Sequence, residues 1–330
     1  MSIQDEIKKE KIRMNKKRRR KGRIVALVIL FICLFIIGFS GGAFFYVFGG
    51  LNTTDMPDDN DSLGISSEAD QANTGGVTNI ALFGVDTRGN DDSGRSDAIM
   101  ILSVNNDAAE INMVSILRDS KVAIEGHGVT KINHAYAYGG APLAVKTLNQ
   151  NFDLDIKNYV TVNFNQLSQI VDAVGGVYLT LTDAEVQSAN HNMEDSFPSE
   201  PRISGSGEML LTGPQAVSFA RIRNIDSDNA RADRQQQVLK AIFTKIQTMS
   251  KADYPSFIRE FLKITETSLG FGDLLSLSPI MLKGNLSFNQ YVVPDEHENP
   301  WGGTDTDGVW YWKYDLDAAA QRIHSIIYNN

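Results

Sequence analysis

Residues 77–119 read VTNIALFGVDTRGNDDSGRSDAIMILSVNNDAAEINMVSILRD. Within this segment, three apolar or alternating stretches are typical of β-strands: Val77–Val85, Ala98–Val104 and Ile111–Leu117. The short polar segment Asn105–Glu110 between the second and third stretches predicts a hairpin turn. The segment therefore predicts the centre of a β-sheet.

Charged residues of both signs stand at the ends of these strands. If the first two strands also pair antiparallel, Asp86, Arg95, Asp97 and Arg118 gather at one end of the sheet. Two carboxylates beside several guanidiniums suit a phosphate or pyrophosphate bridged by a divalent metal ion. Surface salt bridges of little energetic value also occur at strand ends, so these residues alone leave both interpretations open.

A second cationic region follows roughly a hundred residues later. A helix is predicted to reach Arg221. A long helix at Ala230–Met249 carries Arg231, Arg234, Gln235 and Gln236 in its first turns. On a helix, the side chains of residues i and i+2 point in directions about 200° apart around the helix axis. Arg221 and Arg223 can therefore reach one ligand only if the first helix ends there. A helix N-terminus favours anions through its free amides and its dipole.

Strand and helix patterns mix along the rest of the chain. Pro142–Asn151 and Gln166–Val174 predict helices, and Tyr159–Phe164 and Val177–Leu181 predict strands. The predicted fold class is α/β, or mixed α+β, with a central mixed sheet that is flanked by helices.

The first fifty residues predict a membrane anchor. Residues 1–23 hold eleven of the 31 Lys and Arg residues, although the whole chain has a net charge of −9. Ile24–Phe48 carries no charge, and a helix of that length spans roughly 37 Å, enough to cross a bilayer. A cleaved signal peptide is the alternative, but its apolar region is about 7–15 residues long. The positive-inside rule predicts a single-pass type II protein, with residues 1–23 in the cytoplasm.

The region after the span predicts an extracellular domain on a stalk. Residues 49–76 are rich in Asp, Ser, Asn and Gly, which is typical of a flexible linker, and residues 77–330 form the domain. The only cysteine, Cys33, lies in the predicted span, so the domain has no disulfides. This usage resembles exported proteins of Gram-positive bacteria. Beside a span, the basic tail indicates topology rather than binding of nucleic acid.

Several catalytic motifs are absent from the sequence. The chain has no GxxxxGK[ST] loop, which argues against nucleotide hydrolysis, and no GxSxG, HExxH or SxxK motif. Its five histidines are scattered and form no zinc pattern. The Asp and Arg residues are therefore the strongest candidates for chemistry.

Seven motifs occur in a specific order, and the set resembles the LytR-CpsA-Psr family. They are Gly84–Arg88, Gly94–Asp97, Leu117–Asp119, Lys131–Ala135, Val171–Val177, Phe219–Arg223 and Arg231–Gln236. The tail, the span and the stalk match as well, and the clear resemblance covers about Val77–Met249. Leu117 replaces the usual Pro and Phe219 a common Tyr, and neither change removes a charged group.

The resemblance implies a phosphotransferase that works outside the membrane. Such an enzyme transfers an anionic glycopolymer, such as wall teichoic acid or capsule, from an undecaprenyl-pyrophosphate carrier to the muramic acid 6-hydroxyl of peptidoglycan, forming a phosphodiester. A pyrophosphatase on the same lipid and a non-enzymatic regulator that binds it are the alternatives. The lipid tail is expected in an apolar slot between the sheet and the helices.

The resemblance also implies roles for individual residues. Asp86 and Asp97 are expected to hold Mg²⁺ or Mn²⁺. The expected pyrophosphate ligands are Arg88, Arg95, Arg118, Arg221, Arg223, Arg231 and Gln236. Asp97, Arg118 and Asp119 are the catalytic candidates, and Asp119 acts either as the general base or as the residue that orients Arg118.

Overall fold

The computed structural model describes residues 54–73, 76–85, 94–223, 225, 228–250, 252–277, 279–280 and 286–328. The chain divides into two units, residues 1–50 and residues 51–330, and every described residue belongs to the second. Within that described part, no helix is long and apolar enough to cross a bilayer. The predicted tail (1–23) and span (24–48) lie outside it, so the anchor stays a prediction.

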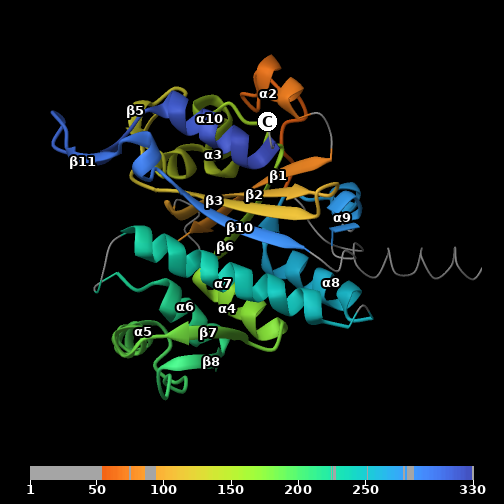
Figure 1. Ribbon diagram of the computed structural model, residues 1–330, viewed down its shortest axis with the longest axis vertical. Helices are drawn as coiled ribbons and strands as arrows, with labels where there is room; N and C mark the ends of the chain where they lie inside the picture. The colour runs from red at the N-terminus through yellow and green to blue at the C-terminus, as the bar shows by residue number, and fades with distance from the viewer. Residues whose placement is uncertain are drawn as a thin grey trace, which may run out of the picture. The chain divides into compact units, whose positions relative to one another are not determined.

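A six-stranded mixed sheet forms the centre of the second unit (Figure 1). The strand order is β10 (Ser287–Val293), β3 (Glu110–Ile116), β2 (Ser96–Asn105), β1 (Val77–Val85), β6 (Asn158–Asn163) and β9 (Glu266–Thr267). β2 pairs antiparallel with both β1 and β3, whereas β1–β6 and β3–β10 are parallel. The predicted strands and the hairpin turn are confirmed to within two residues, and so is the mixed α+β class.

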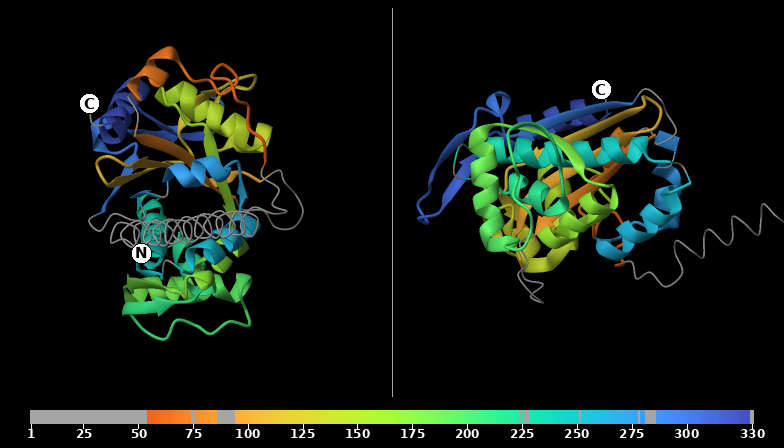
Figure 2. Two further views of the ribbon diagram at one scale, coloured as in Figure 1. Left: turned by 90° about the vertical axis from the view of Figure 1, so that its right-hand side faces the viewer. Right: turned by 90° about the horizontal axis from the view of Figure 1, so that it is seen from below.

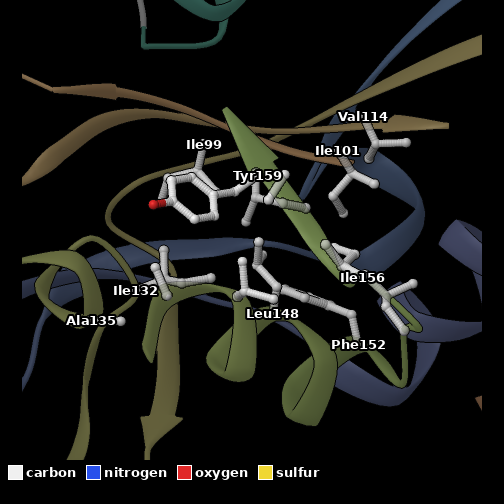
Figure 3. Close-up of a cluster of buried hydrophobic side chains, with 14 of the residues drawn as sticks. Ile99, Ile101, Val114, Ile132, Ala135, Leu148, Phe152, Ile156 and Tyr159 are labelled. Carbon is white, nitrogen blue, oxygen red and sulfur yellow. The ribbon is translucent and has the colours of Figure 1, made fainter. Parts of the chain in front are cut away.

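One face of the sheet is covered by α3 (His134–Phe152), α10 (Leu316–Tyr328) and the short α2 (Ser67–Ala72) (Figure 1). Ile99, Ile101 and Val114 of the sheet pack against Leu148 and Phe152 of α3, as Figure 3 shows. Burying an aliphatic or aromatic side chain of this size contributes about 1.5–3 kcal/mol. This layer is the main core of the unit.

Residues 54–73 belong to this layer, and the prediction of a flexible stalk there was wrong. Leu63 is 1% exposed and Ala69 is not exposed at all, because both enter the main core. α2 begins at an N-cap in which Ser66 Oγ accepts from the Ala69 amide at 2.9 Å and donates to Asp153 at 2.5 Å. The segment is polar in composition, but its few apolar residues are placed where they can pack.

A break within α3 explains why the sequence predicted a helix that begins only at Pro142. Gly139 and Gly140 have non-helical backbone angles, with φ of +63° at Gly140, which glycine adopts without strain. Pro142 follows two residues after Gly140 and lies in the first turn of the second part, where its missing N–H costs nothing. The predicted helix at Pro142–Asn151 is therefore confirmed, preceded by a short helical segment from His134.

The opposite face of the sheet carries a helical layer (Figures 1 and 2). Its elements are α4 (Phe164–Ala173), β7 (Val177–Leu181), α5 (Asp183–Ser196), β8 (Gly207–Leu211), α6 (Gly213–Ala220), α7 (Asp228–Thr248), α8 (Tyr254–Ile264) and α9 (Phe271–Leu277). This layer has its own core around Val171, Phe219 and Val238. The predictions for α4, β7 and α7 are confirmed to within two residues.

Three small elements complete the unit: the hairpin of β4 (Lys121–Ile124) and β5 (Gly128–Lys131), the hairpin of β11 (Trp301–Thr304) and β12 (Trp310–Lys313), and the 3-10 turn η2 (Glu296–Glu298). Arg322 of α10 fastens η2, because its guanidinium donates to Glu298 at 2.9 Å and to Asp295 at 2.5 Å. We call Arg322, Asp295 and Glu298 the Arg322 cluster.

Candidate active site

The candidate site lies where β2 begins and β3 ends. β1 and β2 run antiparallel, so the last residue of β1, Val85, pairs with Ser96 at the start of β2. Arg118 follows β3 and donates from Nη1 to Asp97 Oδ1 at 2.5 Å. The strand pairing thus brings Asp97 and Arg118 together, as expected from the sequence.

Two more arginines reach Asp97 from the helical layer. Arg223, which follows α6, donates from Nη2 to Asp97 Oδ2 at 2.8 Å. Arg231, in the first turns of α7, donates from Nη2 to the Asp97 backbone carbonyl at 2.9 Å. Two cationic regions that are far apart in the sequence therefore meet on one acidic residue. We call Asp97, Arg118, Arg223 and Arg231 the Asp97 cluster.

The arginines keep Asp97 ionised. Burial by itself would raise the pKa of the Asp97 carboxyl, but the charge and hydrogen bond of Arg118 and the charges of Arg223 and Arg231 outweigh it. The net effect holds the pKa of Asp97 below its usual range. An ionised carboxylate is the form that ligates a divalent cation.

Asp119 is held in an ion pair beside Arg118. Its Oδ1 lies 2.7 Å from Lys131 Nζ, and its Oδ2 lies 3.5 Å from Arg118 Nε. Both carboxylate oxygens thus face cations, and one of these cations is the Arg118 guanidinium. This geometry favours the orienting role for Asp119 over the role of general base.

Arg95 and Arg221 lie beside the cluster rather than in it. The Arg95 side chain is exposed. Partial burial of the His134 ring lowers the pKa of His134, and the nearby charges of Arg95 and Lys131 lower it further. α6 ends at Ala220, which is the condition for Arg221 and Arg223 to reach one ligand. Arg221, however, lies 4.4 Å from the Phe164 ring centre and donates to Ser196. Arg221 and Arg223 therefore turn to different partners in this structure.

A pocket opens beside the Asp97 cluster, and it distinguishes two neighbouring glutamines. Gln235 lines the pocket together with Asp97, Arg118, Asp119, Arg231 and Trp312. Gln236, the residue predicted as a pyrophosphate ligand, is 3% exposed, and its amide donates to Ser115 Oγ and to the Tyr291 carbonyl, both at 2.7 Å. The structure thus gives Gln236 a packing role and makes Gln235 the better ligand candidate.

Helical spacing was the signal that could have identified Gln235. Arg231 and Gln235 are four residues apart on α7 and share a face, whereas Gln236 is rotated from Arg231 by about 140°. Trp312 gave no such signal, because β12 reaches the pocket from the far end of the sequence. Only the folded chain places Trp312 at the same pocket as Arg118.

Two predicted site residues, Asp86 and Arg88, lie outside the described residues. In the part of the chain that is described, no three His, Cys, Asp or Glu side chains are grouped closely enough to hold a metal ion. Asp97 nevertheless fits the predicted metal-binding pair of Asp86 and Asp97, because its carboxyl is ionised. Its neighbour Ser96 pairs with Val85, the residue just before Asp86.

Comparison with known proteins identifies the family. The LytR_cpsA_psr family matches residues 44–325, which is most of the chain. The chain belongs to the LytR_cpsA_psr family. The family resemblance inferred from the seven motifs is therefore confirmed.

Members of this family with known names and structures are similar over most of their length. The polyisoprenyl-teichoic acid–peptidoglycan teichoic acid transferase TagU of Bacillus mycoides is 31% identical over 92% of this chain and 96% of its own. A structure of TagT bound to LIIa-WTA matches with a TM-score of 0.63 and 28% identity, over 77% of this chain and 90% of that one. TagT with bound octaprenyl pyrophosphate lipid matches with a TM-score of 0.58 and 26% identity, over 77% and 89%.

Proposed function

We propose that this chain is a phosphotransferase that attaches a teichoic acid or a related anionic glycopolymer to peptidoglycan, using an undecaprenyl-pyrophosphate-linked donor. The observation that carries this proposal is the Asp97 cluster, in which three arginines from two distant regions surround one acidic residue at a pocket. Guanidiniums bind phosphate oxygens with two parallel hydrogen bonds, so this arrangement suits a pyrophosphate. The names and ligands of TagU and TagT support the same class of substrate.

The reaction is a displacement at phosphorus. The 6-hydroxyl of muramic acid attacks the phosphorus that carries the glycopolymer, a new P–O bond forms, and the bond to the bridging oxygen breaks. Undecaprenyl phosphate leaves, and the hydroxyl proton is released. Negative charge on the phosphoryl oxygens must be stabilised during this step, and Arg118, Arg223 and Arg231 are placed to do so.

Asp97 is proposed to hold Mg²⁺ or Mn²⁺ together with Asp86. A bound divalent cation supplies charge neutralisation on the pyrophosphate oxygens. Asp97→Ala is expected to abolish metal-dependent transfer while the protein stays folded, which activity and circular dichroism measured together will test. Normal transfer in the presence of a chelator would show that the metal role is wrong.

The prenyl chain is proposed to lie between the sheet and the helices α8 and α9. On this face of the sheet Leu82, Leu102 and Val162 are only partly buried, in contrast to the well-filled face against α3. Phe261 of α8 and Leu274 of α9 stand opposite them and are also partly buried. Incompletely buried apolar side chains on facing layers suit a hydrocarbon chain.

The protein is proposed to be a single-pass type II membrane protein with an extracellular catalytic domain. The basic tail and the uncharged segment 24–48 support this topology. Protease added to intact protoplasts is expected to remove the domain while sparing an epitope placed before Ile24. Protection of the C-terminal domain would contradict the topology.

In the decisive experiment, the full-length protein is incubated with a lipid-pyrophosphate-linked polymer, a divalent cation and peptidoglycan oligomers. The products are then identified by mass spectrometry. A phosphodiester-linked polymer–glycan product is expected. Release of undecaprenyl phosphate with a free polymer phosphate, independent of the oligomers, would indicate the alternative pyrophosphatase. Absence of any turnover would favour a lipid-binding regulator.

A further inference from the structure

The hairpin of β11 and β12 has two different faces. Residues paired across antiparallel strands point to the same side. Gly302 pairs with Trp312 and Thr304 with Trp310, so Trp310 and Trp312 share one face. Trp301 pairs with Lys313, which places Trp301 on the other face.

The face with two tryptophans is built as a continuous aromatic surface. The rings of Trp310 and Trp312 pack edge to face, with centroids 5.2 Å apart and planes at 82°. A Cβ at Gly302 would lie 2.7 Å from the Trp310 ring and 3.2 Å from the Trp312 ring. The absence of a side chain at Gly302 therefore allows both rings to lie across the opposite strand.

This aromatic surface begins inside the candidate site. Trp312 lines the same pocket as Arg118 and Asp119, and its backbone amide donates to the Asp119 carbonyl at 2.9 Å. Its indole Nε1 is buried without a hydrogen-bond partner among the described residues. From Trp312 the surface continues to Trp310, which is 38% exposed.

The hairpin is fastened to the unit although it extends from its side (Figure 1). Asp305 forms ion pairs with Lys313 at 2.8 Å and with Lys121 of β4. Tyr311, on the face opposite Trp310, is 1% exposed and so anchors β12 to the unit. The two rings are thus held in position before any ligand arrives, which lowers the entropic cost of binding.

We propose that Trp310 and Trp312 form the subsite for the acceptor, a glycan strand of peptidoglycan. This inference rests on the proposed function, because the acceptor hydroxyl must approach the phosphate held at Arg118. Sugar rings present apolar C–H faces that stack on exposed aromatic rings, and indole N–H groups donate to sugar hydroxyls. A glycan lying along this face would place one of its sugars next to the pocket.

A membrane surface is the competing occupant of exposed tryptophans, and charge disfavours it. The turn between β11 and β12 carries Asp305 and Asp307, and the lysines nearest to it are already paired with Asp305. An anionic lipid surface attracts cationic segments and repels such a turn. An uncharged sugar face has no such penalty.

The test compares Trp310→Ala with Trp301→Ala in the full-length protein in detergent. Trp301 is a matched control, because it is 56% exposed but lies on the other face of the hairpin, with its ring centre 4.8 Å from Lys313 Nζ. Loss of an aromatic anchor typically weakens binding about tenfold or more. Trp310→Ala is expected to raise the KM for a soluble peptidoglycan oligosaccharide by about that factor, with kcat and the KM for the lipid donor unchanged. Trp301→Ala is expected to leave all three values unchanged.

Calorimetric binding of the same oligosaccharide separates this inference from the proposed function. Transfer by the wild type with an unaltered acceptor KM in Trp310→Ala would overturn the subsite and leave the function standing. Oligosaccharide binding that requires Trp310, without transfer, would overturn the function and keep the glycan site. Brominated lipids quench the fluorescence of tryptophans that enter a membrane. If they quench the wild type but not Trp310→Ala, and the oligosaccharide does not bind, the surface belongs to the membrane instead.

Discussion

The Asp97 cluster and the Arg322 cluster use the same residue types with opposite balances of charge. In the Asp97 cluster three arginines converge on one acidic residue beside a pocket. In the Arg322 cluster one arginine contacts two carboxylates, and Glu298, which is 1% exposed, also accepts from the Asp295 amide at 2.7 Å. The carboxylates of the Arg322 cluster are thus satisfied locally, by a capping box and a guanidinium.

This difference separates a binding site from a structural ion pair. Guanidiniums in close proximity repel one another, so the gathering of Arg118, Arg223 and Arg231 around Asp97 suits the binding of a further anion. A balanced cluster with backbone hydrogen bonds needs no ligand. The convergence of several arginines at a pocket therefore favours a binding site, whereas the presence of Arg–carboxylate pairs alone does not.

The largest expected effect is on stability, in the Arg322 cluster. Arg322→Ala leaves the buried Glu298 carboxylate without its cation and is expected to lower the free energy of unfolding by about 3–5 kcal/mol. Urea denaturation measures this change. Activity per folded molecule should stay within about twofold of wild type, since none of these three residues lines the pocket. A large loss of activity without a loss of stability would erase the distinction between the clusters.

Arg118→Lys is expected to lower activity strongly and to change stability little, which is the reverse of Arg322→Ala. Lysine keeps the charge but loses the planar fork, so transition-state stabilisation should fall by about 2–4 kcal/mol, or roughly 30- to 1000-fold in rate. Donor turnover and melting temperature are measured on the same preparation, with Arg221→Ala and Arg223→Ala beside it. Near-normal turnover with a collapsed melting temperature would make these arginines structural.

The two neighbouring glutamines repeat the contrast on a smaller scale. Gln235→Ala should lower kcat/KM for the donor by roughly tenfold with little change in stability, because Gln235 lines the pocket. Gln236→Ala should lower the free energy of unfolding by about 1–3 kcal/mol, since it removes two buried hydrogen bonds. Kinetics and chemical denaturation of both variants are the measurement. Exchanged phenotypes would restore Gln236 as the ligand.

The smallest expected effect is a pH dependence. Burial opposes the shift, but hydrogen bonds from His297 and the charge of Arg322 hold the pKa of Asp295 below its usual range. A carboxyl with a depressed folded-state pKa contributes stability above the unfolded value of about 3.9 and loses it as the pH falls. Stability from this group should thus be constant between pH 7 and 5 and decline below about pH 4. Asp295→Asn should make the acid decline shallower, as thermal melts across this range will show.

The sequence predicted those parts of the fold in which local pattern and tertiary packing agree. β1, β2 and β3 are apolar stretches separated by polar segments of the sequence, so their positions and their pairing were predictable. The segment around Leu63 and Ala69 was not, because composition averages over the few apolar residues that decide packing. For such a segment, the position of each apolar residue matters more than the mean polarity.

The site was predictable to the extent that chain topology determines it. Asp97 and Arg118 meet because the start of β2 lies beside the end of the antiparallel strand β3, and strand pairing can be inferred from sequence. The contact of Arg223 with Asp97 depends on how the helical layer packs on the sheet, and no local pattern encodes that. The place of Gln235 and Trp312 at the pocket was not predicted for the same reason, although the four-residue spacing from Arg231 was available for Gln235.

The meeting of the Asp97 cluster from two layers has a consequence for product release. In the proposed mechanism, a pyrophosphate is held at once by Arg118 from the sheet and by Arg223 and Arg231 from the helical layer, which meet at Asp97. Transfer divides this ligand into two monophosphates, one on the lipid and one in the new phosphodiester. Neither product can keep all the contacts that the intact donor made, so each is held more weakly than the donor. Cleavage of the pyrophosphate thereby clears the site for the next donor.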